Sequence, residues 1–381
     1  MAPFLPDDVV REILLRLQHS SSLARASLVC KHWRGLVTDP SFLRRLGGAP
    51  FLGVFHNNPP VSPEFIPAGG DDAPDCARAS RFPPPAHPWL VRDCRRGLVL
   101  LCDVRRFLVW NPASDDRVPL PRPPPALGRY FGAALLRDDD DDGFRVAVAF
   151  VDDEGVAVGA VYASDTGAWG GHVTSKAPAS GNILWFQKPG AVVGEAAAHW
   201  LLDGCRVLRL HAGGQQRPAV LSVLEPTNAP SLDPRDLNVQ LTRTPDGGLG
   251  LTAVTGTALR QWVLKTDDRA TSWMLSRKVS HLDALFPGPR RRRRPGRFRE
   301  ELSLASVIEH DDPESPPCAR ITGADEDGAM VFLRRMDGLF LLRLQPTPRI
   351  SKICGPYYVM RKSYDIVFPL HLFFPLVGIN V

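Results

Sequence analysis

The chain has 381 residues, 44% of them hydrophobic, so we expect a small module plus a larger domain rather than one ordinary core. Its 37 prolines, about twice the usual share, favour turns and β-structure over long helices. The net charge of +5 does not indicate a nucleic-acid-binding face, because seven arginines between Arg290 and Arg299 supply it and the rest of the chain carries −2.

The first predicted element is an amphipathic helix that begins after Pro6. Asp7 and Asp8 stand in its first turn, where the helix dipole favours anions, and Glu12 precedes Arg16 by four residues. The apolar residues fall at i, i+3, i+4 and i+7, at Val10, Ile13, Leu14 and Leu17.

A second helical pattern follows. Ser21 or Ser22 is placed to cap it, and its apolar positions run through Cys30 to Val37 and stop before Pro40. Within it, "LVCKHWRGLVTDPSFLRRL" combines a thiol, an imidazole, an indole and arginines in one apolar stretch. Such a mixture is compatible with a metal site, a reactive thiol or a docking surface.

Docking is the favoured hypothesis for this stretch. Cys30 and His32 would lie about 200° apart around a helix with no second Cys or His pair nearby, which disfavours a metal. A nucleophilic Cys30 would need a base and a buried cleft, which three short helices do not offer. The first 46 residues carry more apolar side chains than so small a module hides, so part of that surface should face a partner.

Residues 49–90 are predicted to form a Pro-rich linker or irregular segment. Prolines recur throughout these residues and include the run from Pro83 to Pro85. A ligand for an SH3-like domain is the second interpretation of the same run.

From residue 91 onward, pairs of β-rich runs recur as hairpins. Five pairs are visible: "GLVLLC" with "FLVW", "FRVAVAFV" with "VAVGAVY", "AHWLL" with "RVLRL", "GLGLTAV" with "ALRQWVL", and "AMVFL" with "LFLLRL". A strand repeat of roughly 40 to 50 residues predicts a β-propeller. We expect about six blades, the sixth completed from the chain ends.

The last repeat carries an insert at residues 287–317, basic in its first half and acidic in its second. We expect a solvated loop there, with a nuclear-import signal as the alternative for Arg290 to Arg294. The seven scattered cysteines and the lack of a secretory signal indicate free thiols in the nucleus, the cytoplasm or both. The longest apolar run is interrupted by Pro369 and Pro375, so no membrane association is expected.

The sequence resembles known families in two places. "LPDDVVREILLRL" and "SSLARASLVCKHWRGLVTDPSFLRR" resemble the F-box, with its Leu-Pro opening, Ile-Leu helix, Val-Cys-Lys-x-Trp-Arg segment and Asp-Pro-x-Phe close, over residues 5–46. "DCRRGLVLL", "LVWNPAS" and "VYASDTGAW" are similar to the region after the F-box in a large plant family, most of all its grass members. The ending after Cys354 departs from that family, which puts closure of the last blade in question.

The resemblance implies a multidomain α+β protein, with a three-helix F-box at 1–48 and an F-box-associated β-propeller-like domain at 91–381. It implies a non-catalytic substrate receptor of a Skp-cullin-F-box ubiquitin ligase, with no cofactor or metal. Its partners would be the Skp adaptor, through it the cullin and RING subunits, and an unidentified target protein.

The same resemblance implies a set of adaptor-facing residues. They would be Leu5, Pro6, Val10, Ile13, Leu14, Leu17, Val29, Cys30 and Trp33. Burial in the module's own core is the alternative for each, because docking and core positions interleave on short helices.

Two other classes of function stay open. A propeller enzyme or small-ligand binder would need acidic or His residues converging at the propeller axis. A nucleic-acid-binding regulator would depend on the Arg290 to Arg294 run. Neither is favoured: no nucleophile elbow, zinc-protease motif, P-loop or dinucleotide fingerprint occurs in the chain, and nucleic-acid binding rests on the Arg run alone.

Targets are expected to bind the loops between strands rather than the blades. The candidate loops are those around Arg105 and Arg106, at Asp165 to Trp169, and at Asp267 to Trp273. The alternative is that these are ordinary turns, with Trp169 and Trp273 packed between blades.

Overall fold

The structure is a computed structural model of the whole chain. It describes residues 5–16, 26, 30–39, 42, 51–57, 62–68, 83–103, 106–124, 131–136, 143–152, 154–176, 188–194, 196–213, 218–230, 232, 238–267, 270–287, 318–355 and 366–371. The polybasic run and most of the predicted insert lie outside these residues.

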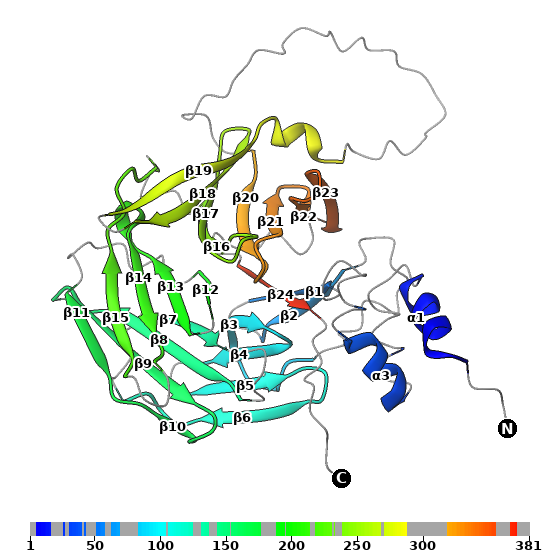
Figure 1. The fold of residues 1–381 in the computed structure, drawn as a ribbon, viewed down its shortest axis with the longest axis horizontal. Helices are drawn as coiled ribbons and strands as arrows, with labels where there is room; N and C mark the ends of the chain where they lie inside the picture. The colour runs from blue at the N-terminus through cyan, green and yellow to red at the C-terminus, as the bar shows by residue number, and fades with distance from the viewer. Residues whose placement is uncertain are drawn as a thin grey trace, which may run out of the picture.

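Two helices are described near the N-terminus, and they lie to one side of a ring of strands (Figure 1). Helix α1 (Asp7–Leu15) begins after Pro6, as predicted, and helix α3 (Lys31–Thr38) follows Cys30. They pack through one apolar cluster, formed by Val10, Leu14, Ala26, Leu36, Val37 and Phe42. Neither helix is long and apolar enough to cross a bilayer.

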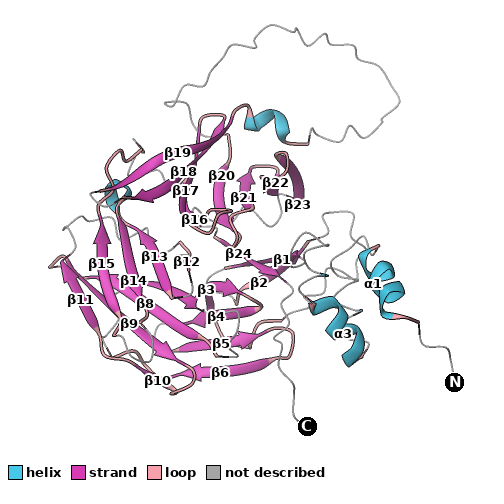
Figure 2. Cartoon of the chain, viewed as in Figure 1, coloured by secondary structure: helices cyan, strands magenta, loops and turns pink. Residues whose placement is uncertain are grey.

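The β domain is a propeller of six blades, in which each sheet is antiparallel (Figure 2). The first blade contains β3 (Leu90–Arg95), β4 (Leu98–Cys102), β5 (Phe107–Asn111) and β6 (Asp116–Leu120). The second contains β7 (Gly132–Leu136), β8 (Arg145–Val151), β9 (Val156–Ala163), β10 (Ala168–Trp169) and β11 (Val173–Lys176). The third contains β12 (Ala191–Val193), β13 (Ala197–Leu201), β14 (Val207–His211) and β15 (Val220–Leu224).

The remaining blades follow the same order from the axis outward. The fourth contains β16 (Val239–Arg243), β17 (Leu249–Thr255), β18 (Ala258–Thr266) and β19 (Thr271–Val279). The fifth contains β20 (Arg320–Ala324), β21 (Met330–Arg335), β22 (Gly338–Arg343) and β23 (Arg349–Cys354). The sixth contains β24 (Val367–His371), β1 (Phe51–His56) and β2 (Glu64–Pro67). Short 3₁₀ turns lie at Asp203–Cys205 and Leu282–Leu285.

The sixth blade closes the ring by joining the two ends of the propeller. Strand β24 pairs antiparallel with β1, and Pro369 lies opposite Val54. Because Ala68 N–H donates to Leu52 O, Val54 directs its own backbone groups to β2, so Pro369 occupies a position where a missing N–H breaks no bond to β1. The atypical ending therefore does supply the closing strand.

The linker prediction is wrong for part of its range. Residues 51–56 and 64–67, placed inside the Pro-rich segment, are strands β1 and β2. Their short apolar runs were masked by the surrounding prolines, and their pairing partner β24 lies at the other end of the chain. The rest of the linker prediction is largely outside the described residues.

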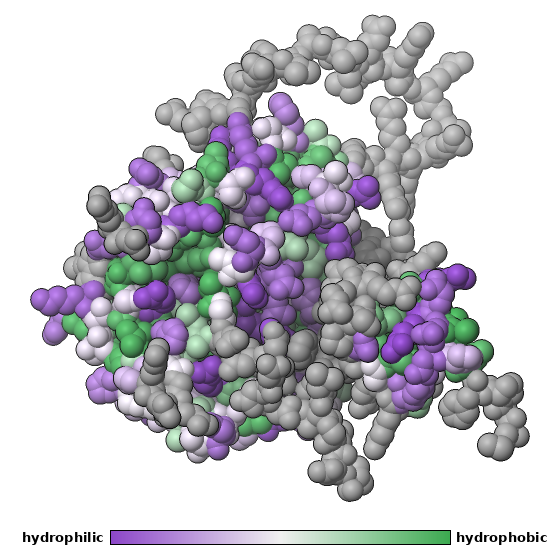
Figure 3. Space-filling model, viewed as in Figure 1, coloured by the Kyte–Doolittle hydropathy of each residue, from purple (hydrophilic) through white to green (hydrophobic). Residues whose placement is uncertain are grey.

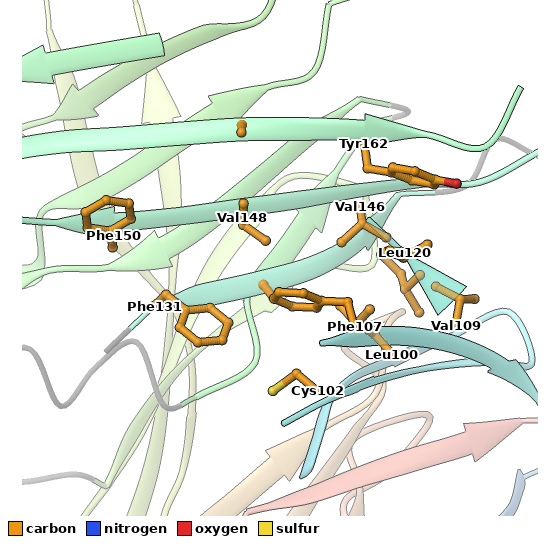
Figure 4. Packing of buried hydrophobic residues seen from close by; sticks show 13 residues of the cluster. Leu100, Cys102, Phe107, Val109, Leu120, Phe131, Val146, Val148, Phe150 and Tyr162 are labelled. Atoms are coloured by element: carbon orange, nitrogen blue, oxygen red, sulfur yellow. The ribbon is translucent and has the colours of Figure 1, made fainter. Parts of the chain in front are cut away.

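The core consists of six apolar clusters, each shared by two neighbouring blades. Figure 4 shows the cluster between the first two blades, where Phe107 of β5 faces Phe131 and the β8 residues Val146 and Val148. The ring centroids of Phe107 and Phe131 lie 5.7 Å apart, in an edge arrangement. Every blade is therefore packed against a neighbour on both sides.

Buried polar side chains tie adjacent blades together near the axis. Asn57 exchanges two hydrogen bonds with the backbone of Val91, at 2.8 and 2.9 Å. Asp93 accepts from Leu135 N–H at 2.8 Å, and Asn238 accepts from Ile321 N–H while donating to Ala319 O. These contacts satisfy backbone groups that lie between blades, where no strand pairing reaches them.

Candidate functional site

Helix α1 has two different apolar sides. Val10 and Leu14 are buried, at 4% and 0% exposure, against α3. On an adjacent side, about 100° around the helix, Val9 and Ile13 are 43% and 46% exposed, and Leu5, just before the helix, is 55% exposed. Val9 and Ile13 are four residues apart, so they form one exposed apolar stripe.

The expected adaptor-facing residues fall into two groups, those buried in the module's own core and those left exposed. Val10 and Leu14 belong to the module's own core, so in this structure their side chains are closed to a partner. Leu5, Pro6 and Ile13 are exposed, and Trp33 is half-buried against the core. Leu17 and Val29 lie outside the described residues. Val9 is also exposed, but the resemblance to the F-box did not place it among the adaptor-facing residues. Its four-residue spacing from Ile13 is the sequence signal that identifies it as part of the stripe.

Cys30 does not lie within a helix, in contrast to the prediction of one continuous apolar helix through it. Its backbone is extended, with φ −160° and ψ 165°, and its Sγ accepts a hydrogen bond from Trp33 N–H at 3.4 Å. Cys30 is therefore the N-cap of α3. The predicted pattern could not show this break, because a cap changes the backbone without interrupting the apolar spacing.

Polar contacts fix the angle between the two helices. His32 Nε2 lies 2.9 Å from Asp7 Oδ1, and Arg11 Nη2 lies 3.6 Å from Asp39 Oδ2. The first pair joins the starts of the two helices, and the second joins the middle of α1 to the C-cap of α3. His32 is thus engaged with a carboxylate of α1, and Cys30 with the backbone of its own helix.

The described residues contain no group of three or more His, Cys, Asp or Glu side chains placed to hold a metal ion. None of the six described cysteines forms a disulfide: Cys30, Cys94, Cys102, Cys205, Cys318 and Cys354. Burial raises the pKa of the Cys205 thiol to about 11, so it is protonated near neutral pH.

The propeller axis does gather charged groups, which is the arrangement a propeller enzyme requires. Asp93, Arg95, Asp325 and Glu326 line one pocket there. Asp93, however, is committed to structure: its carboxylate accepts from Arg95 Nε at 2.9 Å and from Leu135 N–H, while burial raises its pKa. Arg95 Nη2 in turn donates to Gly190 O at 2.7 Å, across to the third blade.

The described residues enclose only a small cavity at the axis. It encloses about 20 Å³ of cavity space, room for about one water molecule. Figure 3 shows hydrophilic residues gathered around the centre of the ring, with apolar residues between the blades. Asp93 and Arg95 of the first blade therefore join it to the second and third blades.

One of the three candidate recognition loops carries a surface cluster. Arg106 Nε lies 2.8 Å from Asp103 Oδ2, and Arg106 Nη2 lies 2.7 Å from His87 Nε2. The same His87 nitrogen is 2.8 Å from Asp103 Oδ2, and the Arg106 guanidinium lies 5.4 Å from the Trp89 ring centroid. This loop is thus held rigidly against the segment that precedes β3. Arg105 lies outside the described residues.

The tryptophans of the other two loops pack between blades. Trp273 is 3% exposed and donates to Cys205 O at 3.0 Å, and Trp169 donates to Pro121 O at 2.7 Å. Because strands alternate in direction, the connections at 164–167 and 267–270 both lie at the blade end opposite to the connection at 103–106. The three candidate loops do not form one surface.

Comparisons with known proteins agree with the N-terminal site. The F-box domain family matches residues 3–45. A protein of Arabidopsis thaliana named as an F-box protein is 29% identical over 180 residues, which cover 45% of this chain and 47% of the relative. The chain therefore spans about half the length of that relative.

Two solved structures show weak likeness. The SapL1 lectin in complex with alpha methyl fucoside has a TM-score of 0.41 at 11% identity, and the match covers 81% of this chain and 98% of the lectin chain. The β-propeller domain of Cps50 (Swd1) from Myceliophteria thermophila has a TM-score of 0.34 at 11% identity, covering 68% and 69%. Both TM-scores are below 0.5, so the six-blade ring rests on the strand pairing alone.

The described chain thus combines a helical module that presents an apolar stripe with a six-blade propeller. The family match specifies the first part. The chain carries an F-box domain at its N-terminus, followed by an all-β propeller, and F-box domains bind Skp adaptors in ubiquitin ligases.

Proposed function

We propose that this protein is the substrate-recognition subunit of a Skp-cullin-F-box ubiquitin ligase. The observation that carries the proposal is the exposed apolar stripe of Leu5, Val9 and Ile13 inside the matched F-box. Exposed apolar side chains on one helix face favour burial against a partner helix. The stripe would contact the Skp adaptor, which links the chain to the cullin and RING subunits.

The propeller would then select the target protein. Its blades are committed to packing against one another, so recognition belongs to surfaces outside the six apolar clusters. In this role the chain holds a target near a catalytic partner and performs no chemistry itself. The small space at the axis supports a binding role over a catalytic one.

The adaptor contact is tested by comparing substitutions in the exposed stripe with a substitution in the module's buried core. Val9→Ala with Ile13→Ala should remove two side chains that become buried only in the complex, weakening adaptor binding by on the order of 2 to 3 kcal/mol. The melting temperature of the full chain should change little, because both side chains are already about half exposed. Calorimetry with purified adaptor measures the first effect, and thermal unfolding measures the second.

Leu14→Ala is the contrasting variant. It empties a fully buried position and should destabilise the helical module by about 2 to 5 kcal/mol, so any loss of adaptor binding accompanies unfolding. Met336→Ala, in an exposed turn of the propeller, is the control that should affect neither property. Undiminished adaptor binding by the folded Val9 and Ile13 variant would exclude the stripe as the docking surface.

A further inference from the structure

The outer strand of the fourth blade presents an open edge. Strand β19 is last in its sheet, and among the described residues its outer side meets only Thr227, which bridges to Ser272. Trp273 N–H points outward, because it donates to Thr227 O at 3.1 Å. By alternation the N–H and C=O of Leu275 also point outward, beyond the reach of Thr227.

This edge also carries the one pair of adjacent, exposed, large apolar side chains in the described propeller. Met274 and Leu275 are 54% and 57% exposed. The outermost strands of other blades show only single residues of this kind, Val118 on β6 and Val220 on β15. An apolar pair beside an open backbone edge is the combination that accepts an added strand.

The other half of the edge is basic. Lys278 is exposed and lies directly opposite Arg260 of β18. Arg277 lies opposite Gln261, and its half-buried guanidinium donates through Nη1 to Leu344 O at 3.0 Å. Both Arg277 and Lys278 carry a positive charge, which attracts the carboxylates of a partner. The bulge at Ser276 places Leu275 and Lys278 on the same face, as their partners Trp262 and Arg260 show.

Each face of β19 therefore changes from apolar to basic along the strand. Leu275 precedes Lys278 on one face, and Met274 precedes Arg277 on the other. A complementary strand must be apolar in one half and acidic in the other. A blade edge with this pattern selects its partner both by backbone pairing and by charge.

We propose that the β19 edge binds an extended segment of the target protein, half apolar and half acidic, as an additional strand of the fourth blade. The segment pairs with the outward backbone groups of Leu275, covers Met274 and Leu275 with its apolar half, and places carboxylates beside Arg277 and Lys278. This inference rests on the proposed function, since it names the class of target that the receptor takes.

The probe is a synthetic peptide of about nine residues, acidic in one half and alternating Val and Thr in the other, made in both orders. Binding to the full chain is measured by fluorescence anisotropy at low and at moderate salt. One order should bind, with affinity that falls as salt rises because carboxylates meet exposed cations. A peptide of the same length with Lys in place of its acidic residues should not bind.

Two single variants locate the site. Leu275→Asp places a carboxylate in the apolar half and should weaken binding by about tenfold or more. Lys278→Glu should weaken the acidic peptide and admit the Lys peptide, a reversal that a merely structural effect does not produce. Val220→Asp, a matched change at an equally exposed outer strand, should leave binding unchanged.

Three outcomes would overturn the inference: no binding of either peptide order, equal weakening by Val220→Asp, or binding that appears only after deletion of residues 290–314. That segment carries apolar residues followed by acidic ones, so the last result would assign the edge to the chain's own insert. Adaptor binding is measured on the same variants. Absence of peptide binding by the parent chain, with its adaptor binding intact, contradicts this inference alone, whereas undiminished adaptor binding by Val9→Ala with Ile13→Ala contradicts the proposed function.

Discussion

Two buried ionisable residues make opposite contributions to stability as pH changes. Asp325 accepts from Met330 N–H at 2.9 Å, and burial raises the pKa of its carboxyl to about 6 from 3.8. His199 Nδ1 lies 3.3 Å from Ala191 O, and burial lowers the pKa of its imidazole to about 4 from 6.5. The fold therefore favours the neutral form of both side chains.

The direction in which Asp325 changes stability with pH follows from the raised pKa of its carboxyl. Between about pH 4 and 6 the folded state keeps a proton that the unfolded state has lost, so stability falls as pH rises through this window. Asp325→Asn keeps an acceptor for Met330 N–H and removes the charge. Urea unfolding should show this variant more stable than the parent at pH 8 by on the order of 3 kcal/mol, with no gain near pH 4.

His199 gives the contrasting result. Its folded pKa is depressed, so its neutral form costs nothing above about pH 6.5, and stability is lost as pH falls toward 4. His199→Gln should relieve that loss in acid and have little effect of this kind at pH 8. Identical pH profiles for the parent and both variants would show that neither burial effect operates.

At the scale of elements, the closing blade differs from the other five. Its strands come from both ends of the propeller, β24 from residues 367–371 and β1 and β2 from residues 51–67. Phe368 and Leu370 of β24 are each 2% exposed in the cluster shared with the first blade. The sixth blade can separate from its neighbours without disturbing the loops that connect the strands of any other blade. We therefore expect it to unfold locally before the other five.

Hydrogen exchange tests this order of opening. Amides of β1 and β24 should exchange faster than those of β21 and β22. Leu370→Ala, which should cost about 2 to 5 kcal/mol, should accelerate exchange mainly in β1, β2 and β24. Leu342→Ala removes an equally buried side chain from β22 and is the matched comparison. If both variants accelerated exchange uniformly, the ring would open as one unit and the closing blade would have no special role.

The whole molecule owes its positive charge to residues outside the described structure. Replacing Arg290 to Arg294 with Ser would lower the net charge from +5 to 0. The melting temperature should stay nearly unchanged, because arginine side chains are almost never fully buried unless they are paired. Solubility near pH 7 should fall, because proteins of near-zero net charge associate more readily.

The same variant tests the import prediction for the run. Nuclear accumulation of the parent, and its loss in the Ser variant at equal stability, would support an import signal. A large drop in melting temperature would instead show that the run is structural. If nucleic-acid binding persisted after the replacement, the basic site responsible for it would lie in another part of the chain.

Local patterns in the sequence were sufficient for much of the architecture. The five predicted hairpins coincide with the two middle strands of five blades, for example β8 with β9 and β21 with β22. Those strands are buried on both faces and pair with neighbours a few residues away, so their apolar runs are continuous and their turns are local. The F-box was recognisable for a similar reason, since its motif lies in one short segment.

The remaining features depend on contacts between residues far apart in the chain, and only the tertiary structure decided them. Ring closure pairs Val54 with Pro369, and no local pattern links two such distant, proline-interrupted segments. Val10 and Ile13 satisfy the same helical spacing, yet packing against α3 buries the first and leaves the second exposed. The residue types and their spacing determine which elements form, whereas burial, which depends on what each element meets in space, determines which side chains are left to bind a partner.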